Sequence, residues 1–178
     1  MEKWKKSIGI QVLKEIGIRS DQYILDFGCG SGVYSIMTSK IVGTNGKIYA
    51  LDYDENSLKD LTNKIKSKNI KNIEIIKSTR EIQVPLQDNS IDVVLIYDSY
   101  HLLNKNERNK LLQESYRILK RNGFISYHVT HIGSYDIELK VVKERIKKYG
   151  FKSLKEYKKP MFHWAWIEEG LILNYFKI

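Results

Sequence analysis

Cysteine is almost missing from this sequence, since Cys29 is the only one among 178 residues. A single thiol cannot form an intramolecular disulfide, and it cannot build a cysteine cluster around a metal ion. Disulfide-stabilised secreted domains and cysteine-bound zinc sites are therefore excluded. The expected location is cytoplasmic, where thiols stay reduced.

Long apolar runs are also missing. No uncharged apolar stretch approaches the roughly 20 residues that span a bilayer, so we expect no membrane partner. Near the N-terminus, Trp4, Ile8, Val12 and Ile16 recur at four-residue intervals with polar residues between them. This pattern predicts an amphipathic helix within residues 1–20 rather than a signal peptide.

Repeats, linkers and low-complexity tracts are absent, so nothing divides the chain into parts. A length of 178 residues suits one domain with a single sizeable core. The content of 42% hydrophobic and 29% charged residues is ordinary for a globular protein. We expect one domain over residues 1–178.

Positive charge is present in excess: 30 Lys and Arg stand against 21 Asp and Glu, which gives a net charge of +9. Basic side chains bind nucleic acid by displacing counterions from its phosphates. Here the lysines are spread along the whole chain, which favours an ordinary solvated surface. RNA remains an alternative partner.

Short apolar runs alternate with longer segments of helical period, which is typical of a parallel sheet with helices on both faces. The runs that predict strands are Tyr23–Phe27, Lys47–Leu51, Ile73–Ile76, Ile91–Ile96 and Phe124–Val129. The helices between them are expected at about Ser31–Ile41, along Leu58–Ile65, and through Leu111–Leu119 to a stop at Asn122 and Gly123.

The C-terminal part of the chain has a different pattern. Apolar residues from Leu139 to Tyr149 share one helical face, and Gly150 ends that helix. The last two apolar runs, Ser153–Tyr157 and Trp164–Phe176, have no helical segment between them. They predict an antiparallel pair that closes the sheet.

The first predicted strand ends in a glycine-rich turn, DFGCGSG, over Asp26–Gly32. Glycines at alternate positions let the backbone turn sharply and let a ligand approach closely. The G-x-G-x-G spacing differs from the dinucleotide fingerprint G-x-G-x-x-G, whose helix receives a pyrophosphate. Asp26 would repel phosphate and attract the ammonium group of an amino acid, so the turn suits a methionine tail better than a diphosphate.

The second predicted strand leads to Asp52 and Tyr53 beside this turn. A carboxylate at this place accepts hydrogen bonds from both hydroxyls of a ribose, and Tyr53 can lie along an adenine. In a purely structural reading, Asp52 only begins the next helix, whose candidate N-caps are Asp54 and Asn56. The glycine turn upstream favours the ribose role.

Four segments together resemble class I S-adenosylmethionine-dependent methyltransferases, especially the small type 11 group: ILDFGCGSGVYS, IYALDYDENSL, VPLQDNSIDVVLIYDSYHLL and ESYRILKRNGFISY. The resemblance covers roughly Tyr23–Tyr127. It implies a Rossmann-like, doubly wound, three-layer α/β fold with a seven-stranded sheet, mostly parallel with an antiparallel last strand. Residues 21–135 would form the cofactor-binding half, and residues 136–178 a helix and the closing strand pair.

The resemblance also implies the cofactor, S-adenosylmethionine, and the residues that hold it. Asp26 and the glycine turn would contact the methionyl part, Asp52 the ribose and Tyr53 the adenine, while Tyr97 would flank the reacting end. The full expected set is Asp26, Phe27, Gly28, Cys29, Gly30, Ser31, Gly32, Asp52, Tyr53, Ser78, Thr79 and Tyr97.

Two departures from the family pattern concern turns. Where the family often has an acidic residue that binds the adenine amino group, this chain has Ser78, Thr79 and Arg80. Backbone groups or Ser78 are expected to take over that contact. The second departure is Arg121–Gly123, where the family usually has a proline-glycine turn.

Methyl transfer is an in-line displacement from an activated sulfonium, so the protein mainly supplies alignment and a dry site. A general base is needed only if the acceptor loses a proton as it attacks. The candidates are Asp98, Tyr100 and His101, which follow the fourth strand. In the family, a histidine at this place is commonly structural, and we favour a hydrogen-bonded support role for His101.

His128 and His131 bracket the end of the fifth strand, and with His101 they raise the question of a metal site. Ordinary hydrogen bonds are the favoured interpretation, so no metal is expected. Cys29 is interpreted as a small space-filling residue. Phe162, Trp164 and Trp166 are expected in the core or at an interface rather than as a stacking platform for the acceptor.

The methyl acceptor is expected to be a small molecule, because no inserted cap domain and no Asn-Pro-Pro-Tyr motif are present. Its pocket would be built from the helix around Trp4 and from the loops Asp98–Leu103 and Thr130–Asp136, and dimerisation is one way to close it. The oligomeric state therefore stays open between monomer and homodimer. The alternatives are an RNA or protein methyltransferase and a non-catalytic protein that binds S-adenosylmethionine.

Overall fold

The structure is a computed structural model that describes residues 3–79 and 81–178. Its centre is a seven-stranded sheet in the order β3-β2-β1-β4-β5-β7-β6. The strands are β1 (Tyr23–Phe27), β2 (Lys47–Asp52), β3 (Ile73–Lys77), β4 (Ile91–Tyr97), β5 (Leu119–Val129), β6 (Phe151–His163) and β7 (Trp166–Lys177). The helices are the π-helical turn η1 (Trp4–Ile8), α1 (Gly9–Glu15), α2 (Val33–Val42), α3 (Glu55–Ser67), the 3₁₀ turn η2 (Tyr100–Leu102), α4 (Lys105–Ile118) and α5 (Leu139–Lys148).

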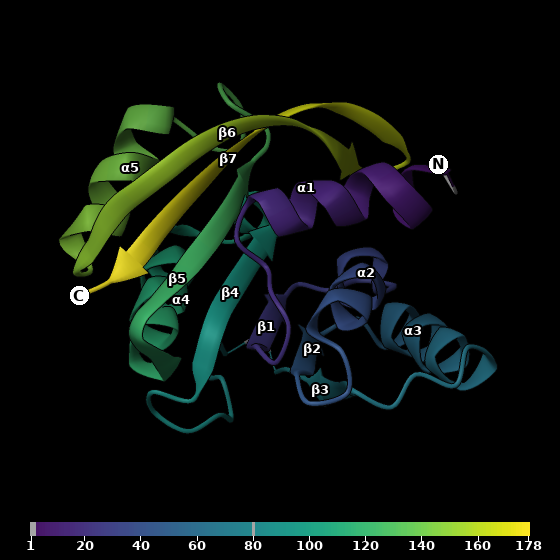
Figure 1. Cartoon of the computed structure of the whole chain (residues 1–178). Coiled ribbons are helices and arrows are strands. Elements are labelled where there is room, and N and C mark those ends of the chain that lie inside the picture. Colours follow the sequence, from purple (N-terminus) through teal and green to yellow (C-terminus); the bar gives the residue numbers. More distant parts are fainter. Residues whose placement is uncertain (1–2, 80) are drawn as a thin grey trace.

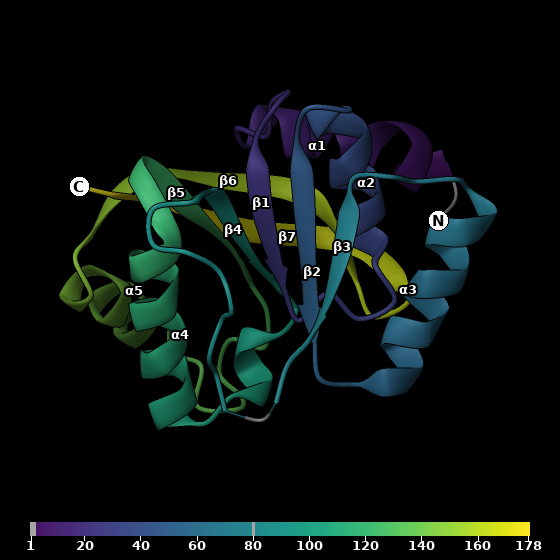
Figure 2. The ribbon, with the colours of Figure 1, turned by 90° about the horizontal axis from the view of Figure 1, so that it is seen from below.

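The direction of the strands confirms the expected fold class. The ladders of β1 with β2 and β4, of β2 with β3, and of β4 with β5 are parallel. β7 runs antiparallel to both β5 and β6. α1, α2 and α3 cover one face of the sheet, and α4 and α5 cover the other (Figures 1 and 2). The chain therefore has the three-layer, doubly wound arrangement, with its switch point between β1 and β4.

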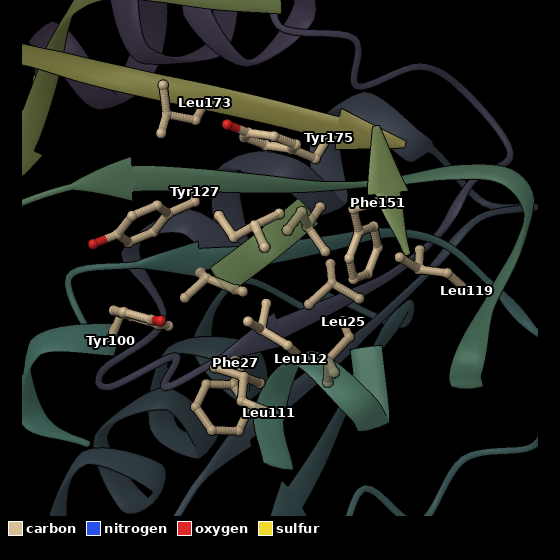
Figure 3. Packing of buried hydrophobic residues seen from close by; sticks show 14 of the residues in the cluster. Leu25, Phe27, Tyr100, Leu111, Leu112, Leu119, Tyr127, Phe151, Leu173 and Tyr175 are labelled. Atoms are coloured by element: carbon tan, nitrogen blue, oxygen red, sulfur yellow. The ribbon is translucent and has the colours of Figure 1, made fainter. Parts of the chain in front are cut away.

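The core consists of two apolar layers separated by the sheet, because successive side chains of a strand point to opposite faces. Ile24 of β1 packs toward α1 and α2, whereas the adjacent Leu25 packs toward α4 and α5. Figure 3 shows the second layer, in which Leu111 and Leu112 of α4 meet residues of β1, β5, β6 and β7. Full burial of each such leucine stabilises the fold by roughly 1.5–3 kcal/mol.

The predicted end of α4 is wrong. The helix stops at Ile118 instead of reaching Asn122 and Gly123, and β5 begins at Leu119. The backbone of Leu119 pairs with Ile91 of β4, and the ladder then shifts register before it continues. Pairing with β4 therefore takes these residues out of the helix, and the Asn122–Gly123 turn lies in the resulting irregularity.

The N-terminal helix confirms the predicted amphipathic segment except at one position, and residues 1–2 lie outside the described range. Trp4, Val12 and Ile16 are buried, but Ile8 is 45% exposed. In the π-helical turn the amide of Gly9 bonds to the carbonyl of Trp4. The wider turn places Gly9 above the indole, so Ile8 faces outward.

The β6–β7 hairpin is longer than predicted and curls over the sheet to reach α1 (Figure 1). Three contacts hold it there. The Trp4 indole donates to the Pro160 carbonyl at 3.0 Å, and Asn174 donates to the Ile16 carbonyl at 2.7 Å. The Tyr34 hydroxyl donates to the Phe162 carbonyl at 2.8 Å and accepts from the Phe162 amide at 3.0 Å.

Within residues 3–79 and 81–178, no helix is long and apolar enough to cross a bilayer.

Candidate functional site

The glycine turn between β1 and α2 needs its three glycines for different reasons. All three have positive φ: 72° at Gly28, 50° at Gly30 and 78° at Gly32. A Cβ on Gly28 would lie 2.4 Å from Cβ of Ser99, and one on Gly32 would lie 2.2 Å from Cδ1 of Leu61. A Cβ on Gly30 would meet no atom of the described residues within 4 Å. The turn is closed at its two ends and open at its middle, where a ligand can reach the backbone.

Asp52 is bound to the open part of this turn. One carboxylate oxygen accepts from the Gly30 amide at 2.7 Å, and the other accepts from the Asp54 amide at 2.9 Å. Its side chain does not cap α3, because Asp54 does so by accepting from the Ser57 amide at 2.8 Å. A carboxylate has about four acceptor sites, so Asp52 retains capacity for two hydroxyl groups of a ligand.

Asp26 lies deeper, on β1, with 2% of its surface exposed. Burial raises the pKa of its carboxyl group to about 6, an effect that the hydrogen bond from Ser35 opposes and the nearby Asp52 carboxylate reinforces. The Ser35 hydroxyl, which the sequence did not single out, donates to Asp26 at 2.5 Å. At neutral pH this carboxylate carries a poorly solvated charge, which an approaching ammonium group would neutralise.

The remaining residues of the turn contribute packing rather than exposed functional groups. Cys29 is buried against Leu58 and Leu61, and burial raises the pKa of its thiol, so the space-filling interpretation agrees with the structure. Phe27 belongs to the core, and its carbonyl accepts the Ser99 hydroxyl at 2.9 Å. The Ser31 carbonyl accepts the Lys64 ammonium group at 2.9 Å.

The expected adenine side is exposed and polar. Tyr53 is 58% exposed next to Asp52. The Ser78 amide donates to the Asp52 carbonyl at 2.8 Å, which holds the end of β3 beside the end of β2. The hydroxyls of Ser78 and Thr79 turn back to neighbouring carbonyls at 2.7 and 3.3 Å. Arg80 lies outside the described residues.

Tyr97 is the last residue of β4, not the first one past it. It is 3% exposed, its hydroxyl shares a 2.7 Å hydrogen bond with Ser126, and its ring packs edge-on against Tyr34. In this position it forms part of the wall beneath the site.

The three candidate bases have different surroundings. Tyr100 is buried, and its hydroxyl accepts from Arg145 at 3.2 Å. Burial, together with His131 and His163 nearby, lowers the pKa of His101 to about 4, so its imidazole is neutral at physiological pH. Asp98 has a left-handed backbone (φ 53°), and its buried Oδ1 has no well-aligned hydrogen-bond donor among the described residues.

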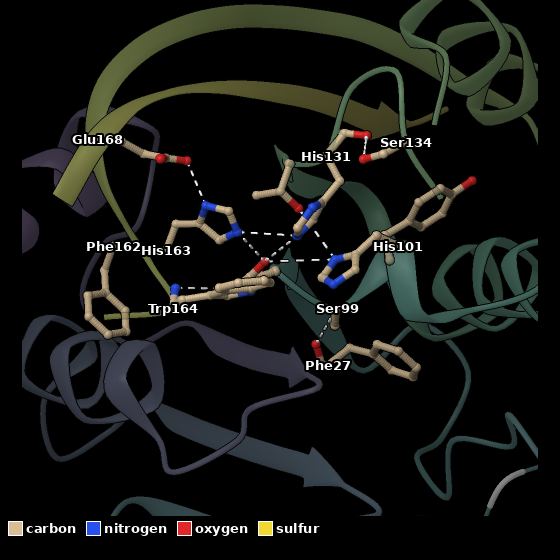
Figure 4. A network of polar contacts seen from close by, with 12 residues as sticks. Phe27, Ser99, His101, His131, Ser134, Phe162, His163, Trp164 and Glu168 are labelled. Carbon is tan, nitrogen blue, oxygen red and sulfur yellow. Dashed lines mark hydrogen bonds and ion pairs between the residues drawn. The ribbon is translucent and has the colours of Figure 1, made fainter. Parts of the chain in front are cut away.

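The structure adds a histidine that the sequence did not connect with this place. His163, at the end of β6, brings Nε2 to 3.2 Å from Asp98 Oδ1 and to 3.3 Å from His131 Nε2. The rings of His101, His131 and His163 converge beside the end of β4 (Figure 4). His128 lies apart on β5, where neither ring nitrogen has a hydrogen-bond partner within the described part of the chain. The expectation of ordinary hydrogen bonds is therefore wrong for His128.

The expected lining of the acceptor pocket is correct only in part. The loops Asp98–Leu103 and Thr130–Asp136 do meet, because the Arg108 guanidinium donates to carbonyls of both. Trp4, in contrast, is 5% exposed and packs beneath the hairpin. Trp164 and Trp166 are not in the core: they are 56% and 50% exposed at the tip of the hairpin.

Two cavities lie away from this edge of the sheet. One, of about 860 Å³, lies between the Glu81–Leu86 segment and α4, and the other, of about 570 Å³, lies near the start of β2. Neither is lined by the glycine turn, Asp52 or the histidines. The open backbone at Gly30 therefore lies outside both of these cavities.

With this geometry established, comparison with known proteins identifies the family. The methyltransferase domain family matches residues 24–123. The chain belongs to this family. Demethylmenaquinone methyltransferases from Geobacillus stearothermophilus and Listeria welshimeri are 32% and 33% identical over 121 residues. These matches cover 68% of this chain but only 49% and 48% of the relatives, so the chain spans about half the length of the curated relatives that it matches.

A solved structure supports the fold over the whole chain. The structure of a SAM-dependent methyltransferase from Aquifex aeolicus superimposes with a TM-score of 0.83 and covers 99% of this chain and 93% of its own, at 23% sequence identity. The resemblance to class I S-adenosylmethionine-dependent methyltransferases is thereby confirmed. S-adenosylmethionine is the cofactor of this family, and the open glycine turn with its two carboxylates fits it.

Proposed function

We propose that this protein transfers a methyl group from S-adenosylmethionine to a small-molecule acceptor. The observation that carries the proposal is the open Gly30 backbone beside Asp52, whose carboxylate is anchored by two amides and still has free acceptor capacity. In this proposal Asp52 accepts the ribose hydroxyls, Tyr53 lies along the adenine, and Asp26 attracts the ammonium group. Ser78 and Thr79 present backbone groups to the adenine edge.

The cofactor supplies an activated methyl group, and the protein supplies alignment and exclusion of water. The wall beneath the reacting end is rigid, because Tyr97 is fixed by Ser126 and Tyr34. His101 is a poor general base, since a group with a pKa of about 4 has little driving force to remove a proton at neutral pH. The proposal therefore assigns no base and favours an acceptor that is already nucleophilic or ionised.

The acceptor side lies beyond β4, next to the exposed indoles of Trp164 and Trp166. Flat aromatic side chains favour a flat organic acceptor over a macromolecule. The relatives named as demethylmenaquinone methyltransferases support a small acceptor as well. We infer an aromatic or quinol-like acceptor at this side of the site.

Calorimetric titration tests the cofactor site directly. S-adenosylmethionine and S-adenosylhomocysteine should bind, and NAD should not. Asp52→Ala removes a charged acceptor, which is worth roughly 1.5–3 kcal/mol, so binding should weaken roughly 10- to 150-fold. Asp60→Ala, on the exposed side of α3, is the matched control and should bind as the wild type does. Equal affinity in both variants would remove Asp52 from the site.

A second experiment separates an enzyme from a non-catalytic binder. Formation of S-adenosylhomocysteine is measured with a panel of phenols, quinols and amines as acceptors. Turnover with one class identifies the acceptor chemistry. Tight cofactor binding without turnover on any acceptor would support the non-catalytic alternative instead.

A further inference from the structure

Four potential metal ligands from three separate chain segments meet beside the end of β4. Asp98 and His101 come from the segment after β4, His131 from the segment after β5, and His163 from the end of β6. The donor atoms of Asp98, His101 and His131 all lie within 4.8 Å of one another. The side chains are largely shielded from solvent, at 4% exposed for His101, 10% for His163, 13% for His131 and 20% for Asp98.

The separations match those of a tetrahedral metal site. Imidazole and carboxylate donors bind zinc at about 2.0–2.2 Å, which places tetrahedral ligands about 3.4 Å apart. His163 Nε2 lies 3.2 Å from Asp98 Oδ1 and 3.3 Å from His131 Nε2. Asp98 Oδ1 is 3.8 Å from His101 Nδ1 and 3.9 Å from His131 Nε2. The donor atoms that all lie within 4.8 Å of one another are those of Asp98, His101 and His131, so His101 and His163 would have to move closer together as an ion binds.

One of the four donor atoms is unsatisfied in the structure. Asp98 Oδ1 is buried, faces three imidazole nitrogens and has no well-aligned donor among the described residues. A buried carboxylate oxygen in this condition costs free energy unless a cation or a hydrogen bond compensates it.

The contact between His163 and Glu168 favours a bound cation in this cluster. Its Nδ1 lies 2.7 Å from a carboxylate oxygen of Glu168 on β7 (Figure 4). A carboxylate there holds the proton on Nδ1 and leaves the Nε2 lone pair directed at Asp98 and His131. A carboxylate behind a histidine in this way is the usual support of a metal-binding imidazole.

We propose that Asp98, His101, His131 and His163 bind a divalent transition-metal ion, with zinc as the best match to three imidazoles and one carboxylate. Four protein ligands leave no open coordination position. The ion is therefore structural: it ties the tip of the β6–β7 hairpin to the segments after β4 and β5. This role does not depend on the proposed methyl transfer.

The test uses untagged, chelator-stripped protein titrated with zinc chloride alone. We expect one zinc ion per chain, a higher thermal midpoint with zinc, and visible absorption of the tetrahedral type when cobalt replaces zinc. The absence of binding, with a thermal midpoint that zinc leaves unchanged, would overturn the proposal. It would favour a metal-free cluster in which His163 is held by its hydrogen bond to Glu168.

Matched variants separate ligands from neighbours. His131→Gln and Asp98→Asn should lose zinc binding. His128→Gln changes the one histidine that is not a proposed ligand, so this variant should keep zinc binding. Glu168→Gln should weaken zinc binding roughly 10- to 100-fold, and Glu169→Gln should not. Circular dichroism of each variant without metal shows that it is folded. Equal affinity of the two glutamate variants would overturn the assignment of His163 as a ligand.

Zinc binding is read without the methyl donor, so its failure and a failure of the proposed function are distinguishable. If Asp52→Ala loses S-adenosylmethionine binding and keeps zinc binding, the substitution has affected only the cofactor site. Loss of zinc binding in His131→Gln with intact cofactor binding concerns only the metal site.

Discussion

At the scale of single residues, burial gives the two carboxylates beside the glycine turn different properties. Asp52 receives two backbone amides, which fix its orientation. Asp26 is more deeply buried, and its carboxylate accepts from Ser35 of α2. One carboxylate is suited to hold hydroxyl groups in a fixed geometry, and the other is suited to attract a cation.

The burial of Asp26 predicts a specific dependence of stability on pH. Its pKa is about 6 in the folded chain against 3.8 as the ordinary value, so folding favours the protonated form. The resulting penalty is absent below pH 4, grows as pH rises through 6 and then stays constant. A shift of this size corresponds to roughly 2–3 kcal/mol.

Asp26→Asn should therefore gain roughly 2–3 kcal/mol of unfolding free energy relative to the wild type between pH 4 and pH 7.5. Urea unfolding at a series of pH values measures this difference. Asp60→Asn, at an exposed position of α3, is the control and should show a difference that does not change with pH. A constant difference for Asp26→Asn would show that its carboxyl group titrates normally.

Several site residues were predictable from the sequence because short-range pattern determines their place. Asp26, the glycines and Asp52 follow directly from the ends of two predicted strands. His163 was not predictable, since it is 62 positions after His101 and reaches it only through the curvature of the β6–β7 hairpin. The inward direction of Tyr97 likewise depends on Tyr34 and Ser126, which come from other elements.

At the scale of elements, we expect one glycine of the turn to matter mainly for stability and another mainly for ligand binding. Alanine at Gly30 meets open space and costs only the left-handed backbone, roughly 1 kcal/mol. Alanine at Gly32 adds a collision with Leu61, which is fully buried, and should cost roughly 2–4 kcal/mol. The two substitutions make the same chemical change in one turn, so they are a matched pair.

We expect Gly30→Ala to keep most of its stability but to bind S-adenosylmethionine at least tenfold more weakly, roughly 1.4 kcal/mol, because its methyl group would occupy the open space beside the backbone that the proposed cofactor approaches. Gly32→Ala should lower the free energy of unfolding more than Gly30→Ala does. Thermal unfolding and calorimetric titration of both variants check this. Unchanged cofactor affinity in Gly30→Ala would show that the ligand does not approach the backbone at this point.

The elements that sequence patterns missed have a common cause. β6 is an edge strand with mostly exposed side chains and many lysines, so the sequence pattern marks only its part Ser153–Tyr157. Its length is fixed by pairing with β7. The end of α4 is similarly decided by the pairing of Leu119 with β4. The parallel strands β1 to β4 were predicted to within one residue at their ends, because each is a short run of mostly apolar residues.

At the scale of the whole molecule, the hairpin is joined to the N-terminal helix through Trp4 and to α2 through Tyr34. The contact with Tyr34 can be tested by substitution. Tyr34→Phe leaves the Phe162 amide and carbonyl without their partner. Buried unpaired groups cost roughly 1–3 kcal/mol, so unfolding free energy should fall by that amount. Hydrogen exchange at Phe162 should become faster.

The control for this substitution is Tyr49→Phe, which removes a hydroxyl from a partly buried tyrosine at the edge of the core. Its effect should stay within about 0.5 kcal/mol. If both variants unfold alike, the hydroxyl of Tyr34 does not hold the hairpin, and packing of Trp4 and Phe162 alone accounts for the contact.

The distribution of charge over the molecule bears on the two interpretations of the net charge of +9. Several lysines are paired with carboxylates on different elements: Lys47 with Glu74, Lys77 with Glu55, Lys120 with Asp92, Lys143 with Glu156 and Lys159 with Glu15. Pairs of this kind contribute only about 0–1 kcal/mol each to stability. They do, however, reduce the number of cations that are available to phosphates, and they lie on separate parts of the surface.

We therefore expect no specific RNA binding. Retention on immobilised RNA should be weak at low salt and should disappear by about 150 mM salt, because non-specific phosphate contacts are lost steeply as counterions are added. Gel-shift titrations at several salt concentrations measure this. Retention at 150 mM salt that depends on RNA sequence would instead favour the RNA methyltransferase alternative, because contacts to phosphates alone do not distinguish one sequence from another.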